Sequence, residues 1–189
     1  MREPYARHGR VARDTEEFEF DPAAPETVVA AMDRLSAAHD GWINLLPGVD
    51  EEEAPEPEGR GPFTLLFGSP QAPVTMGTWM PAKRGRTGAG EETLGIMHPR
   101  GRHAIASLRA DGVPLPQGWR VRQDHARRGL IVCAPVGTPH AQVLDWALRA
   151  GDALAMVALT GMWRAKVFLP AQATGQPPSA PSAGSSTTS

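Results

Sequence analysis

Seven short strand-like segments, interleaved with three helical ones, leave this chain of 189 residues few folds to adopt. Their order is one helix, four strands, a second helix, two strands, a third helix and a last strand. Strands that follow one another through short loops pair antiparallel, and helices can then gather on one side of the sheet. We therefore expect a single α+β domain, with a largely antiparallel sheet of about six or seven strands and about three helices packed on one face.

Three segments carry the apolar spacing of an amphipathic helix. They are residues 25–41, 102–112 and 138–151. The first ends at Gly41, where a left-handed cap is easily formed. The third has the clearest limits, because Thr138 suits the N-cap, Pro139 the first helical position and Gly151 the position after the last turn. Residues 152–159 either begin another helix or form a buried strand.

The strand-like segments alternate apolar and polar residues or form short apolar runs. They are residues 42–46, 62–68, 74–80, 93–97, 119–123, 130–136 and 162–170. The fifth and sixth predict a β-hairpin with a loop of four to six residues. Alternation places Trp119, Val121 and Gln123 on one face of the fifth strand, with Trp119 in the core. Arg120 and Arg122 lie on the other face.

We place the single domain at residues 25–170. Three segments differ from the rest of the chain in composition, and one of them lies inside the domain. They are a flexible acidic arm at 1–24, an acidic linker interrupted by prolines at 50–60 and a disordered tail of small residues at 171–189. Such compositions bury too little apolar surface to offset the entropy of ordering. Within the arm, Phe18 and Phe20 alternate with glutamates as the residues of an edge strand would.

The cellular setting follows from what the chain lacks. Cys133 is the one cysteine, so neither an intrachain disulfide nor a cluster of thiolate metal ligands can form. The first 20 residues have no apolar signal-peptide core, and no apolar run reaches the roughly 18 residues of a membrane span. We expect a cytoplasmic protein without a membrane partner. The abundance of Arg, Ala, Gly and Pro is typical of a bacterial genome of high GC content.

The formal net charge of −2 hides a strong segregation of charge. Residues 1–58 hold 15 acidic side chains and 5 arginines, whereas residues 59–170 hold 6 acidic and 14 basic side chains. The basic side chains cluster in the hairpin, in the glycine-rich loop at 81–92 and at 99–102. The candidate binding residues are Arg84, Arg86, Arg100, Arg102, Arg120, Arg122, Arg127 and Arg128. On one face, they would attract an acidic protein or a polyanion.

We therefore predict a non-enzymatic binding or adaptor module that presents an arginine-rich surface. Whether nucleic acid is a partner is left open. The tryptophans do not support it, because Trp119 is expected in the core and a core side chain cannot stack on bases. The acidic stretch at 50–58 is either a solvated linker or a strap that covers the basic surface and competes with an outside polyanion. The sequence does not give the oligomeric state.

The alternative is a small enzyme that acts on a phosphorylated or other anionic substrate. Its candidate acids and bases are His98, His103, Asp124 and His125, with Arg100 and Arg102 as anion clamps. An anion could bind where residues 97–103 enter the second helix. Catalysis would require these histidines to converge in a pocket, whereas a binding module would hold them apart. His140 stands alone, and the absence of HExxH, GxSxG and glycine-rich phosphate motifs predicts no metal and no cofactor.

Overall fold

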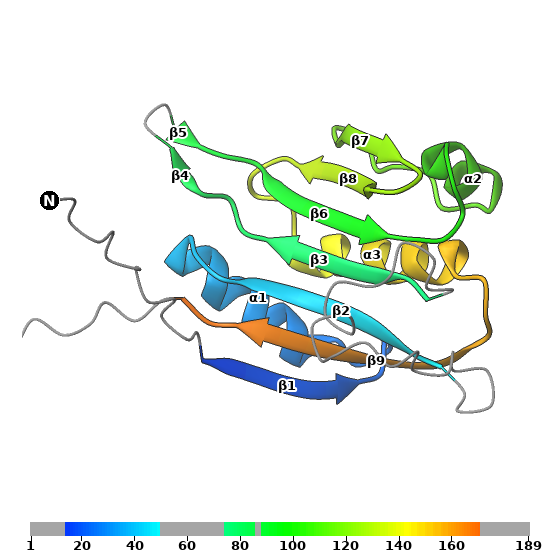
Figure 1. Ribbon diagram of the computed structural model, residues 1–189. Helices are drawn as coiled ribbons and strands as arrows, with labels where there is room; N and C mark the ends of the chain where they lie inside the picture. Colours follow the sequence, from blue (N-terminus) through cyan, green and yellow to red (C-terminus); the bar gives the residue numbers. More distant parts are fainter. Residues whose placement is uncertain (1–13, 50–73, 86–87, 171–189) are drawn as a thin grey trace, which may run out of the picture.

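The computed structural model describes residues 14–49, 74–85 and 88–170 (Figure 1). The expected acidic linker at 50–60, the expected strand at 62–68 and the expected tail at 171–189 lie outside these ranges, as do residues 1–13. In the part of the chain that is described, seven antiparallel strands form one sheet and three helices accompany it. The prediction of a single α+β domain is confirmed.

The sheet has the order β1-β9-β2-β3-β6-β8-β7, and each neighbouring pair is antiparallel. Its strands are β1 (Thr15–Phe20), β2 (Trp42–Val49), β3 (Met76–Met80), β6 (Glu92–Met97), β7 (Arg120–His125), β8 (Gly129–Ala134) and β9 (Leu159–Phe168). A small separate hairpin of β4 (Arg84–Gly85) and β5 (Gly88–Ala89) connects β3 to β6. It projects past the end of β3 and the start of β6 (Figure 1).

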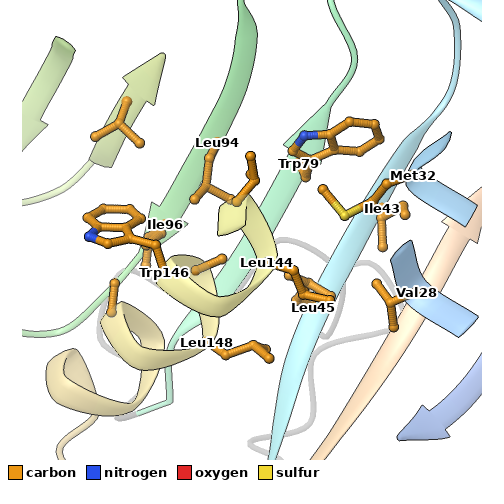
Figure 2. Close-up of a cluster of buried hydrophobic side chains, with 14 of the residues drawn as sticks. Val28, Met32, Ile43, Leu45, Trp79, Leu94, Ile96, Leu144, Trp146 and Leu148 are labelled. Atoms are coloured by element: carbon orange, nitrogen blue, oxygen red, sulfur yellow. The ribbon is translucent and has the colours of Figure 1, made fainter. Parts of the chain in front are cut away.

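The helices are α1 (Glu26–Ala38), α2 (Ala104–Ala110) and α3 (His140–Leu154). Figure 1 shows α1 and α3 behind the sheet, with α2 beside α3 near the end of β7. The core fills the space between the helices and the sheet, and Figure 2 shows part of it. Its largest fully buried side chains include Trp79, Trp146, Met32, Ile43 and Leu94. The opposite face of the sheet carries none of these helices, and we call it the open face.

The acidic arm expected at residues 1–24 is wrong for residues 15–20, which form the edge strand β1. This strand pairs with β9 along its whole length, from Thr15 opposite Phe168 to Phe20 opposite Trp163. Phe20 is buried in the core, Glu17 and Glu19 pair with Arg164 and Lys166 of β9, and Glu16 pairs with Arg34 of α1. The alternation of phenylalanine with glutamate is therefore that of a strand with one face on the core.

The limits of α3 differ from the prediction at both ends. Thr138 does not cap the helix, because its hydroxyl donates to the carbonyl of Pro135 at 2.7 Å, and the helix begins at His140. Gly151 lies inside the helix, where a Cβ would come within 2.6 Å of the Trp163 ring. Packing therefore explains this glycine. The chain from 152 to 159 ends the helix, turns, and enters β9.

A β-bulge changes the predicted faces of the hairpin strand β7. The register with β8 shifts between Val121 and Gln123. Gln123 consequently shares the open face with Arg120, and Asp124 turns toward the helices opposite Leu130. Trp119 is buried against Trp146, as predicted. The predicted loop of four to six residues is shorter, because the strands extend to residues 125 and 129.

Candidate functional site

The open face carries a recess of about 610 Å³ beside the two hairpins. It is lined by the end of β3, the segments that flank the β4–β5 hairpin, the start of β6, and the adjoining parts of β7 and β8. Apolar lining comes from Met80, Pro81 and Ile131. Charged lining comes from Lys83, Glu91 and Arg122. We call this hollow the basic recess.

The charges of the basic recess are not balanced. Glu91 is bound by Arg120, whose Nε lies 2.7 Å from Oε1 and 2.9 Å from Oε2, and whose Nη2 also donates to Oε2. These bonds from Arg120 hold the pKa of Glu91 below its ordinary value. Lys83 and Arg122 are exposed, and neither forms an ion pair within the described residues. The recess therefore presents two cations beside an acid that already has a partner.

His39, the residue after α1, holds in place the side of the recess that carries Lys83. His39 follows the last residue of α1 in a left-handed conformation, with φ of 54°, and its Nδ1 lies 2.9 Å from the carbonyl oxygen of Ala82. Because a carbonyl accepts, Nδ1 is the donor in this bond. Pro81 and Ala82 are buried. The segment before the β4–β5 hairpin is thus tied to the helix layer while Lys83 remains exposed.

The structure divides the predicted arginines between two ends of the sheet. Arg120 and Arg122 lie beside the recess, whereas Arg100 and Arg102 follow the far end of β6, a strand of six residues that spans roughly 20 Å. Arg127 and Arg128 form the turn at the far end of β7. The backbone of Arg84 forms β4, but its side chain lies outside the described part, as does Arg86. The described arginines therefore form two groups.

Asp124 occupies the position where the sequence predicted an anion. Its Oδ1 accepts from the backbone N–H of Ala104 at 3.1 Å, and its Oδ2 accepts from that of Ile105 at 3.2 Å. These are the first two residues of α2, whose N–H groups have no partner within the helix. The bulge in β7 brings the carboxylate here. Asp124 is therefore a capping residue supplied from a neighbouring strand.

The histidines of the enzyme alternative hold three different positions. His125 Nδ1 accepts from the backbone N–H groups of Arg127 and Arg128, at 3.0 and 3.3 Å, and so stabilises the hairpin turn. His103 is exposed and precedes α2 with φ of 66°. His98 is only 6% exposed, and neither ring nitrogen has a hydrogen-bond partner among the described residues. Burial lowers the pKa of His98, and the charge of Asp124 opposes this effect.

The most connected polar cluster involves His140, for which the sequence predicted no partner. Its Nδ1 lies 2.6 Å from Oδ1 of Asp33, and its Nε2 lies 3.1 Å from both Oε1 of Glu92 and Oγ of Ser36. Glu92 is buried, and its Oε2 accepts from the indole N–H of Trp79 at 3.1 Å. We call the group formed by His140, Asp33, Glu92 and Ser36 the His140 cluster.

The His140 cluster contains a serine, a histidine and an aspartate in contact, as hydrolase triads do, but the imidazole nitrogen that faces Ser36 also faces the carboxylate of Glu92. Bonding to Glu92 raises the pKa of His140 above its ordinary value, with a further contribution from Asp33. The protonated form that these carboxylates favour has an N–H at both nitrogens, and in that form Nε2 donates to Glu92 and has no lone pair to receive the Ser36 proton. The cluster therefore links α1, α3 and β6 electrostatically.

A weak sequence signal for the His140 cluster exists in α1. Asp33 and Ser36 are three residues apart and flank the buried Met32 and Leu35, so both lie at the margin of the apolar face. Their alignment with the first residue of α3 depends on how the two helices pack. Spacing along the chain does not encode that contact.

Among residues 14–49, 74–85 and 88–170, no group of three or more His, Cys, Asp or Glu side chains is arranged to hold a metal ion. Within those ranges no helix combines the length and the apolar content needed to cross a bilayer. No protein-family model, no curated protein and no solved structure matches this chain.

Proposed function

We propose that the chain is a binding module that holds an acidic group of a partner protein in the basic recess. One observation carries the proposal. Lys83 and Arg122 come from segments 39 positions apart in the sequence and line the same recess, in which Arg120 already pairs with the acid Glu91. A carboxylate that entered the recess would meet two cations at a surface shaped to receive a side chain.

The composition of the recess favours binding over catalysis. General acid–base catalysis works best with a group whose pKa lies near the operating pH, most often a histidine. None of the described residues that line the recess is a histidine or a cysteine. His98, His125 and His140 lie elsewhere, each in its own structural surroundings. A recess that combines apolar lining residues with two exposed cations fits a ligand that is held rather than transformed.

An acidic protein fits the recess better than a nucleic acid does. A phosphate backbone is bound by cations spread along its path. The described arginines of the predicted binding set instead form two groups at opposite ends of the strands, and the recess adds Met80, Pro81 and Ile131 beside its cations. A carboxylate on an apolar segment uses both features. The predicted competition by the acidic stretch at 50–58 concerns residues outside the described ranges and stays a prediction, as does a cytoplasmic location.

The test measures binding of a fluorescein-labelled glutamate-rich peptide to the full chain by fluorescence anisotropy. The variant combines Lys83→Ala with Arg122→Ala, and the control combines Arg109→Ala with Arg149→Ala, which removes the same charge from exposed helix positions. We expect the recess variant to weaken binding about tenfold, equivalent to about 1.4 kcal/mol. The control should change the Kd less than about twofold, because Arg109 and Arg149 lie on α2 and α3 and do not line the recess.

Two results would contradict the proposal. If both double variants weakened binding equally, the peptide would be responding to overall charge and not to the recess. If the unmodified chain bound the peptide no better than a neutral peptide of the same length at low salt, no acid-binding site would be present. Circular dichroism of each variant provides the check that the fold is preserved.

A further inference from the structure

Three apolar side chains lie on the open face at neighbouring positions of three adjacent strands, and one of them, Met80, also lines the basic recess. Phe168 of β9 pairs with Trp42 of β2, and their rings stack with centroids 4.4 Å apart and planes inclined by 13°. The register of β2 with β3 ends at Ile43 opposite Trp79, and its continuation by one residue places Trp42 opposite Met80. We call Phe168, Trp42 and Met80 the apolar strip.

Alternation along the strands shows that the strip lies on the open face. Ile43, Trp79 and Val167 are the sequence neighbours of the three residues, and each is at most 1% exposed among the helices. Adjacent residues of a strand point to opposite faces, so the strip faces away from the core. Met80 is 37% exposed and also lines the recess. An apolar surface and a basic recess therefore share one residue.

The charges at the two ends of the strip differ. At the Phe168 end, Lys166 lies with its Nζ 5.8 Å from the ring centroid and 3.5 Å from a carboxylate oxygen of Glu17. That cation already has an acidic partner. At the Met80 end, Lys83 and Arg122 have none within the described residues. The surface is complementary to a segment whose apolar part is followed by an acid at one defined end.

We propose that the occupant of this surface is an amphipathic acidic segment of a partner protein. Its apolar side chains pack on the strip, and an acidic side chain just beyond them enters the recess. This inference rests on the proposed function and adds the class and the orientation of the partner. A uniform polyanion would contact only the recess, because it has no apolar side chain to pack on Phe168, Trp42 and Met80.

The dimensions of the strip fit a helical segment. Its residues lie on three adjacent strands, so its length is two strand spacings, or about 10 Å. Two turns of an α-helix cover about 11 Å. Apolar residues at positions i, i+4 and i+7 would therefore follow the strip, and an acid one turn further along would reach the recess.

The test compares four labelled probes with the full chain by fluorescence anisotropy. The first is an acidic peptide with leucines at i, i+4 and i+7 and glutamates one turn beyond. The second is a scrambled peptide of the same composition, the third is oligoglutamate of the same length, and the fourth is a DNA duplex. We expect the amphipathic peptide to bind about tenfold more tightly than the other three, a ratio that corresponds to about 1.4 kcal/mol.

Variants then locate the apolar contact. Met80→Gln should weaken binding of the amphipathic peptide several-fold and that of oligoglutamate much less, because oligoglutamate has no apolar side chain to pack on this residue. Met156→Gln is the matched control, because Met156 is 65% exposed in the segment after α3 and should affect neither probe. As a second measurement, the indole N–H resonance of Trp42, assigned with Trp42→Phe, should shift when the amphipathic peptide is added and stay in place with oligoglutamate.

The outcomes separate this inference from the proposed function. If all acidic peptides bound equally and the Lys83→Ala, Arg122→Ala variant lost them all, the strip would be irrelevant while the acid-binding recess stood. If no acidic peptide depended on Lys83 and Arg122, the proposed function itself would be wrong. Tighter binding of the DNA duplex than of the amphipathic peptide would overturn the inference in favour of a nucleic-acid surface.

Discussion

Glu91 and Glu92 are neighbours in the sequence, yet their side chains serve opposite faces of the sheet. Glu91 lines the basic recess and is bound by Arg120, whereas Glu92 is buried among the helices and bonded to His140. The start of β6 therefore carries the recess on one side and the His140 cluster on the other. His39 adds a second tie between α1 and the recess wall at Ala82.

The His140 cluster makes stability depend on pH near neutrality. The pKa of His140 is raised in the folded protein, so its stabilisation is complete below the unfolded value of about 6.5 and is lost as the pH rises through the folded value. The variant His140→Gln should not show this decrease of stability with rising pH. Below pH 6.5 the variant should be less stable by about 3 kcal/mol, because Glu92 stays buried without its charged partner.

Urea unfolding between pH 5.5 and 9, analysed as free energy of unfolding, checks this prediction. The control is His103→Asn, which removes an exposed histidine and keeps a residue that tolerates the left-handed conformation. A wild-type stability that stayed flat with rising pH, together with a flat profile for His140→Gln, would mean that His140 is not charged in the folded protein.

Periodicity predicted the layers of this fold because a buried face must repeat with the geometry of its helix or strand. It succeeded for α1, whose buried Val28, Met32 and Leu35 fall at helical spacing. It missed the bulge in β7, since an extra residue leaves no mark in the alternation of Arg120 to Gln123. For β1 the alternation was present, but the acidic composition favoured a flexible arm.

The candidate site could be predicted only in part from the sequence. Grouping Arg120 and Arg122 in one hairpin and Lys83 in a neighbouring loop pointed to basic surfaces, and the structure brings Lys83 and Arg122 to one recess. The pairing of Arg120 with Glu91 was not predicted, because it depends on which strands are neighbours. The role of Asp124 as a cap was also missed, since it follows from the bulge.

Asp124 should stabilise the start of α2 and the surroundings of His98. Asp124→Ala leaves two N–H groups of the helix without their partner, and loss of a capping side chain typically costs about 1 kcal/mol. It also removes the charge that opposes the lowering of the His98 pKa, so this pKa should fall further. Urea unfolding and NMR titration of His98 measure the two effects. Asp111→Ala, at the exposed end of α2, is the control and should change neither.

His98 should limit stability in acid. Its pKa lies below 6.5 in the folded state, because burial disfavours the charged imidazole. Above pH 6.5 the imidazole is neutral in both the folded and the unfolded chain, so the free energy of unfolding does not depend on it. As the pH drops from 6.5 through the folded pKa, the unfolded chain takes up the proton first and stability falls. His98→Met removes a buried ring that has no hydrogen-bond partner in the described part of the chain, and it should raise the free energy of unfolding by about 1 kcal/mol at pH 7.5. The gain should be larger at pH 5. A loss of stability at both pH values would show that the imidazole contributes a favourable contact.

Arg120 should act on binding through Glu91 and hardly at all on stability. The pair is exposed, and exposed ion pairs contribute little to folding. Arg120→Gln leaves Glu91 as an unpaired acid in the recess, which should weaken binding of the acidic peptide by repulsion. Glu91→Gln should strengthen it, and the double variant should resemble Glu91→Gln because the repelling charge is gone. This order of affinities, measured by anisotropy, depends on the charge of Glu91. If Arg120→Gln and the double variant instead weakened binding equally, Arg120 would contact the peptide directly.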